Sequence, residues 1–76
     1  MIVKTETGSV YEIDMKNMKM RRSNSEESLR RDGEWITMLK EPIIELGRTM
    51  ILFLEPLSEY QSITTRFTTI VKEIKD

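Results

Sequence analysis

Hydrophobic and polar residues alternate over two short runs at the start of the chain. The runs cover Met1–Glu6 and Val10–Asp14, and Thr7-Gly8-Ser9 separates them. An apolar side chain at every second position is typical of a strand with one buried face, and Gly-Ser between two such runs favours a tight turn. We therefore predict two antiparallel strands that form a hairpin.

A third strand is predicted directly after this hairpin. Asp14–Asn17 has Asx residues at both ends, which favours a turn because their side chains bond to nearby backbone groups. Met18 and Met20 then alternate with Lys19 and Arg21. The three strands are expected to lie side by side as a meander.

Two further apolar runs follow in the middle of the chain. Glu34–Glu41 contains Trp, Ile, Met and Leu and is predicted as a fourth strand, which Pro42 ends because proline has no N–H for a ladder. Gly47 predicts a turn before Thr49–Leu54. Met50 to Leu54 are five consecutive apolar residues, so both faces of that strand should be covered. The second cover is either the far side of a small barrel or a partner subunit.

The tail from Ile63 to Ile74 fits two patterns. Its large apolar residues fall at i, i+4, i+7, i+8 and i+11, which is helical spacing. Eight of the twelve residues are Thr, Ile or Val, and these β-branched side chains favour strands. We choose a strand, with a helix as the alternative.

These elements predict an all-β fold in a single domain, residues 1–76. About six antiparallel strands are expected as a meander or partly closed barrel, similar to SH3-like barrels. The absence of alanine also favours strands over helices. A chain of 76 residues has a small core, and we expect a homo-oligomer to supplement it.

Composition removes most catalytic and metal chemistry. The chain has no cysteine and no histidine, which are the ligands of nearly all zinc, copper and haem sites and include the commonest general base. We therefore expect no metal, no cofactor and no enzymatic activity. The N-terminus lacks the pattern of a signal peptide, and the apolar run at Met50–Leu54 is far shorter than the ~20 residues of a membrane helix. A cytoplasmic protein is expected.

Positive charge is concentrated in the segment Met15–Arg31, which we call the basic segment. It carries six cations and two anions, whereas the rest of the chain has six cations and eleven anions. Arginine suits phosphate because its planar guanidinium offers paired donors. The candidate anion-binding residues are Arg21, Arg22, Ser23, Asn24, Arg30, Arg31 and Trp35.

Each part of this candidate site also has a plainer interpretation. Neighbouring residues of a strand point to opposite faces, so Arg22 should share the buried face with Met20 while Arg21 lies on the other face. Glu26 and Glu27 are placed to neutralise Arg30 and Arg31 in a solvated loop. Trp35 either stacks on a ligand or anchors a core or an interface. With a net charge of −1, the chain is not expected to bind duplex nucleic acid.

Several short motifs occur together in the first two thirds of the chain. They are Thr5-x-x-Gly8-Ser9-x-Tyr11-Glu12-x-Asp14, the doublet Arg21-Arg22, Asp32-Gly33-Glu34-Trp35, and a glycine before the apolar strand Gly47–Leu54. In this order and spacing they resemble a group of small uncharacterised proteins of phages and actinobacterial genomes. The chain departs from that group at Thr68-Thr69-Ile70, where a Thr-Ser-Pro strand would be expected. The resemblance implies an all-β fold and a phage or prophage origin, and no activity.

Two functions from different classes follow from these patterns. The first is a non-enzymatic phage protein that captures an anionic small molecule, such as a nucleotide signal of host defence, in the host cytoplasm. The second is a protein–protein adaptor or virion accessory protein that docks on an acidic host or virion partner. Stabilisation by a small ligand would distinguish the first from the second.

Overall fold

The computed structural model describes residues 1–23, 33–56 and 63–76. Within these ranges every regular element is a β-strand, and no segment forms a helix that could cross a membrane. The strands are β1 (Ile2–Thr5), β2 (Val10–Asp14), β3 (Lys19–Ser23), β4 (Ile36–Thr37), β5 (Thr49–Leu54) and β6 (Thr64–Lys75).

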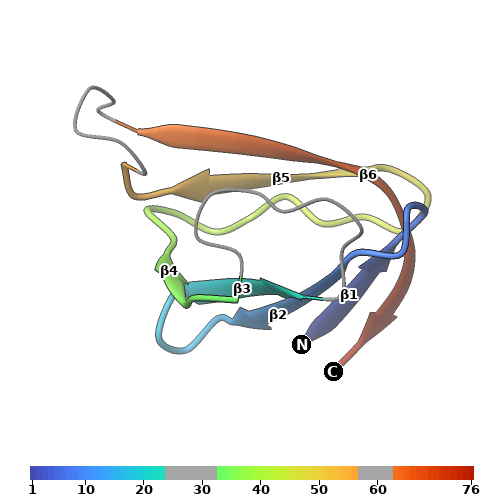
Figure 1. Cartoon of the computed structure of the whole chain (residues 1–76), viewed down its shortest axis with the longest axis horizontal. Helices are drawn as coiled ribbons and strands as arrows, with labels where there is room; N and C mark the ends of the chain where they lie inside the picture. The colour runs from blue at the N-terminus through green and yellow to red at the C-terminus, as the bar shows by residue number, and fades with distance from the viewer. Residues whose placement is uncertain (24–32, 57–62) are drawn as a thin grey trace.

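The six strands form one antiparallel sheet in the order β4-β3-β2-β1-β6-β5. The first four follow one another as a meander, and β6 returns to lie between β1 and β5. Figure 1 shows the sheet curling into a half-barrel, with β5 and the first half of β6 facing β1, β2 and β3. The predicted all-β, partly closed architecture is confirmed.

The two turns of the meander form for local reasons. Gly8 has a φ of 87°, a left-handed conformation that favours glycine, and its N–H donates to the Thr5 carbonyl over 3.0 Å. In the next turn the backbone N–H of Asn17 donates to Asp14 Oδ1 over 3.0 Å. Both turns lie where the sequence predicts them.

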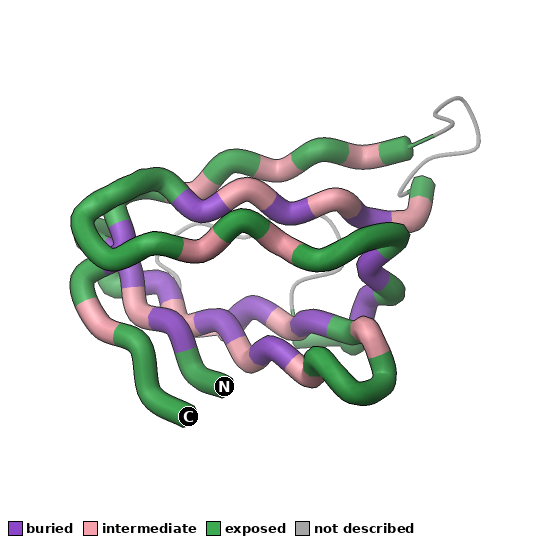
Figure 2. The backbone as a smooth tube through the Cα atoms, turned by 180° about the vertical axis from the view of Figure 1, so that it is seen from behind, coloured by how far each residue is buried: buried purple, intermediate pink, exposed green. Residues whose placement is uncertain are grey.

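The core lies on the concave side of the sheet, and Figure 2 shows the buried positions of the strands alternating with intermediate or exposed ones. Every strand of four or more residues except β6 buries alternate side chains. The buried hydrophobic residues are Val3, Tyr11, Ile13, Met20, Ile36, Met38, Met50, Leu52, Leu54 and Val71. At about 25 cal/mol per Å² of apolar surface removed from water, this core is the main stabilising contribution.

The fourth strand is much shorter than predicted. The sequence indicates a strand over Glu34–Glu41, whereas β4 pairs with β3 only at Ile36–Thr37. After Thr37 the chain leaves β3 and crosses to β5, where Met38 forms a bridge with Leu54. The strand therefore ends because the backbone changes partners, and Pro42 is not its terminator.

The segment after β4 runs along the outer edge of β5. The Leu39 N–H donates to the Phe53 carbonyl over 2.7 Å, and Ile43 and Ile51 exchange two hydrogen bonds of 3.0 Å. This segment brings the two ends of the sheet together. Over the second face of β5 it contributes Lys40, whose Nζ lies 4.2 Å from the centroid of the Phe53 ring. The sequence had assigned the cover of this face to the far side of a barrel or to a partner subunit.

The tail is a strand, as predicted. β6 spans Thr64–Lys75 and pairs first with β5 and then with β1. Only Val71 of its apolar residues is buried, whereas Ile63, Phe67, Ile70 and Ile74 are exposed. The helical spacing of these residues is therefore not the spacing of a core stripe.

Candidate functional site

The two neighbouring arginines of β3 occupy different environments. Arg22 lies on the concave face and is 7% exposed, and its Nη2 donates to Ser9 Oγ over 3.3 Å. Arg21 lies on the convex face, as the alternation of the strand requires. The prediction that Arg22 shares the buried face with Met20 is confirmed. The two guanidinium groups do not converge on a common ligand.

Arg21 is engaged by two neighbours on the convex face. It pairs across the sheet with Glu12, whose carboxylate accepts a hydrogen bond from Arg21 Nη2. Its guanidinium carbon also lies 4.7 Å from the centroid of the Trp35 ring, a cation–π contact. Glu12 neutralises much of the charge that Arg21 would offer to an anion.

Trp35 is 43% exposed and is not part of the buried core. Of the interpretations of Trp35, an anchor of the core is therefore wrong, because β4 begins at Ile36 and turns that side chain, not the Trp35 ring, inward. An anchor of an interface and a stacking surface for a ligand stay predictions. One face of the indole meets Arg21, and the remainder is free to contact solvent or a binding partner.

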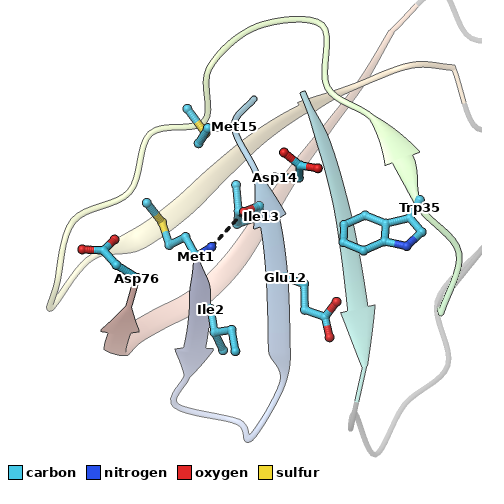
Figure 3. Close-up of a pocket in the computed structure, with 8 residues that line it drawn as sticks. All are labelled: Met1, Ile2, Glu12, Ile13, Asp14, Met15, Trp35 and Asp76. Atoms are coloured by element: carbon cyan, nitrogen blue, oxygen red, sulfur yellow. Dashed lines mark hydrogen bonds between the residues drawn. The ribbon is translucent and has the colours of Figure 1, made fainter. Parts of the chain in front are cut away.

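Trp35 borders a shallow depression on the convex face, shown in Figure 3. Met1 and Ile2 come from the start of the chain, and Glu12 and Asp14 project from β2. The full lining is Met1, Ile2, Glu12, Ile13, Asp14, Met15, Trp35 and Asp76. Apolar side chains share this depression with three carboxylates, so it is not shaped electrostatically for an anion.

The Asp14 carboxylate at this depression is hydrogen-bonded within the fold. Asn17 donates its side-chain amide to Asp14 Oδ2 over 2.9 Å, and its backbone N–H donates to Oδ1 over 3.0 Å. These hydrogen bonds, the amide first, hold the pKa of Asp14 below its ordinary value. In the part of the chain that the structure describes, no three acidic residues come together as a metal site.

The remaining predicted anion-binding residues are placed only in part. Ser23 ends β3 and is half-buried opposite Val10. Asn24, Arg30 and Arg31 lie outside the described residues, so their role in an anion site stays a prediction. Of the predicted set, the structure brings together Arg21 and Trp35 on one face and places Arg22 on the other.

A second surface was not singled out from the sequence as a site. Ile51 on β5 lies opposite Phe67 on β6 and also bridges to Ile43. Ile70 lies opposite Thr49, beyond a shift in the register of β5 and β6 between Thr49 and Ile51. We call Ile43, Ile51, Phe67 and Ile70 the β5–β6 outer surface.

This outer surface is apolar and open to solvent. Phe67 is 66% exposed and Ile43 is 51% exposed. Ile51 lines a shallow depression together with Ile43 and Ile70, at whose rim Arg48 and Glu45 form an ion pair of 3.2 Å. The sequence signal for this surface was the unbroken apolar run Met50–Leu54, whose odd positions had to lie somewhere outside the core.

Comparison with known proteins adds no assignment: no protein-family model, curated protein or solved structure matches the chain.

Proposed function

We propose that this chain is a small non-enzymatic binding protein that docks on another protein through the β5–β6 outer surface. The observation that carries the proposal is the exposure of Phe67, 66%, directly opposite Ile51. Contiguous apolar surface is uncommon on monomeric soluble proteins and commonly marks an interaction site. An adaptor or a virion accessory protein is the class that this surface supports.

Aromatic residues at the centre of such a surface typically provide much of the binding energy. Phe67 has Ile51 beside it on β5, and Ile43 and Ile70 extend the apolar area on either side. The ion pair between Arg48 and Glu45 supplies a polar rim. An apolar centre with a polar rim is the usual composition of a protein–protein interface.

Site-specific photo-crosslinking tests this proposal. A benzophenone amino acid at position 67 should form covalent adducts with the docked protein in cells that make the full chain. The same group at exposed Lys16, in the turn between β2 and β3, is the control. If position 67 yields no more adduct than position 16, the surface does not dock a protein.

Capture of an anionic small ligand is a second proposal, with a different site. It is supported by the charge of the basic segment and by Trp35, whose exposed ring lies beside the Arg21 guanidinium. A planar base or sugar would stack on the indole while the arginines of the segment contact its phosphates. The implied setting is a phage protein that sequesters a nucleotide signal of host defence in the host cytoplasm.

Native mass spectrometry and melting temperature test the ligand proposal. Protein purified from a bacterial lysate should carry excess mass that is lost on denaturation. Cyclic mono- and dinucleotides, as probes, should raise the melting temperature of the wild type but not of the Arg30→Glu/Arg31→Glu variant. The Lys40→Glu/Lys72→Glu variant makes the same change in net charge elsewhere. Equal responses of the two variants would remove Arg30 and Arg31 from the site.

A further inference from the structure

Three residues of the β5–β6 outer surface form a row across neighbouring segments. Ile51 lies opposite Phe67 on one side, and on the other side it exchanges two backbone hydrogen bonds of 3.0 Å with Ile43. Neighbouring strands are about 4.8 Å apart, so Ile51 is the centre of the row. It stands between the buried Met50 and Leu52, and paired residues of antiparallel strands share a face. The row therefore points away from the core.

This row leaves the sheet at its face and not at its edge. In the plane of the sheet, the border at Ile70 is occupied by the same chain, because the Glu6 N–H donates to the Ile70 carbonyl over 2.8 Å. The hydroxyls of Thr7 and Thr69 also lie 3.1 Å apart. The open direction is perpendicular to the sheet, where Phe67 is 66% exposed on the outer wall of the half-barrel (Figure 1).

The charges that border the row are balanced. The adjoining segment 39–48 carries two cations and two anions, which are Lys40, Glu41, Glu45 and Arg48. Glu45 and Arg48 pair with each other over 3.2 Å. A strongly acidic or basic partner finds no excess of the opposite charge here. A second copy of the chain brings the same two signs, so that cations of one border can face anions of the other.

An apolar outer face of a sheet is commonly covered by a second sheet that packs on it. We propose that a second copy of this chain provides that cover, with the β5–β6 outer surfaces of the two copies packed face to face about a two-fold axis at Ile51. Such an interface uses the same patch on both subunits. The proposal rests on the proposed function, because it names the protein that docks at this surface.

The difference in size between Phe67 and Ile43 selects the direction of the axis. An axis along β5 exchanges the two ends of the row, so that each Phe67 faces Ile43 of the second copy and each Ile51 faces its own copy. A large side chain then meets a smaller one at both ends, which keeps the gap between the sheets even. An axis across the strands would place Phe67 on Phe67 and Ile43 on Ile43, and the gap would be uneven.

The size of the face sets the strength of the pair. β5 has six residues, and three neighbouring segments of that length cover roughly 14 by 20 Å. The contact is therefore at the lower end of specific interfaces, which take about 800 Å² from each partner. Phe67 provides a large share, since an aromatic side chain offers about 150–250 Å², of which 66% is exposed here. We expect a dissociation constant on the order of micromolar.

Sedimentation equilibrium of the purified full chain at tens of micromolar tests the proposal. Wild-type protein should approach twice the 9.0 kDa mass of the chain. Phe67→Lys should sediment as one chain with an unchanged circular dichroism spectrum, because this side chain lies outside the core. Met15→Lys is the matched control, since it also replaces an exposed apolar residue by lysine, and it should remain dimeric. A monomeric wild type, or a dimeric Phe67→Lys, overturns the proposal.

Isotope-filtered NMR provides a second measurement that leaves every side chain in place. In a mixture of labelled and unlabelled wild-type chains, NOEs between chains should join the Phe67 ring to the Ile43 methyl groups. Within one chain these residues stand two strand spacings apart, and the filter removes that signal. A dimer without a Phe67–Ile43 contact between chains overturns the face-to-face arrangement.

The photo-crosslinking experiment at position 67 separates this proposal from the proposed function. An adduct of two identical chains supports both. An adduct of another mass with a monomeric purified protein leaves the proposed function standing and overturns the second-copy proposal. The absence of any adduct contradicts both.

Discussion

At the scale of single residues, the two arginines of β3 show how one strand divides its side chains between two environments. Arg22 is almost fully buried and donates to Ser9, whereas Arg21 forms a half-exposed pair with Glu12. Arg22→Ala should lower the free energy of unfolding by about 1–3 kcal/mol, because it removes a buried hydrogen bond and packed atoms. Arg21→Ala should cost only about 0–1 kcal/mol.

Urea unfolding of the two variants measures this difference. Arg22→Met retains the buried stem of the side chain without its polar head, and it separates packing from hydrogen bonding. Equal losses of stability for Arg21→Ala and Arg22→Ala would contradict the assignment of the two residues to opposite faces.

The Asp14 carboxyl gives a second prediction for a single residue. Its pKa lies below the ordinary 3.8 because the Asn17 amide, and then the Asn17 backbone, donate to the carboxylate. A lowered folded-state pKa stabilises the fold above pH 3.8, and this stabilisation is lost as the pH falls through the folded-state pKa. Asn17→Ala should therefore raise the pKa of Asp14, as measured by carboxyl NMR titration.

Glu73 is the control for this titration. Its pKa is lowered first by the charge of Lys4 and then by that of Lys75, and neither cation contacts Asp14. Asn17→Ala should leave the pKa of Glu73 unchanged, whereas Lys4→Met should raise it and leave Asp14 unchanged. If either variant changes the pKa values of both Asp14 and Glu73, the shifts do not arise from the local contacts described here.

At the scale of elements, the strands best predicted from sequence are those that keep the same neighbouring segments along their whole length. Val10–Asp14 and Thr49–Leu54 agree with β2 and β5 residue for residue. Alternation of apolar and polar residues defines β2, because one of its faces is buried along its whole length, whereas an unbroken apolar run between a glycine turn and Glu55 defines β5. β4 was predicted too long because an apolar pattern does not record where a backbone leaves one neighbour for another.

The candidate site was predictable to the same extent. The alternation of side chains along a strand predicted that Arg21 and Arg22 lie on opposite faces, and this prediction needed no tertiary information. It could not give the contact of Arg21 with Trp35, which depends on how β4 pairs with β3. The β5–β6 outer surface depends on the register of Ile51 with Phe67, which are far apart in sequence.

The turn before β5 gives a prediction at the scale of an element. Gly47 has a φ of 82°, and a Cβ placed there would meet no atom within 4 Å. Gly47→Ala should therefore lower the free energy of unfolding by about 1 kcal/mol through backbone strain alone. Gly47→Asn should cost less, because asparagine tolerates this conformation better. Urea unfolding measures the free energy of unfolding of both variants. Equal losses would show that position 47 does not keep its left-handed conformation in the variants.

At the scale of the whole molecule, stability and association are expected to be coupled. Ten hydrophobic residues form the buried core among the described residues, and small domains with limited cores commonly gain stability from oligomers. Binding of one native chain to another lowers the free energy of the native state but not that of unfolded chains. Unfolding of the pair should therefore depend on protein concentration.

The melting temperature of the wild type should accordingly rise with concentration. A tenfold increase adds about 1.4 kcal/mol per pair of chains, about half of which acts on each chain. A domain of this size shifts by roughly 4–8 °C per kcal/mol, so we expect about 3–6 °C per tenfold. A wild type whose melting temperature is independent of concentration would contradict the expected association of the chain with itself.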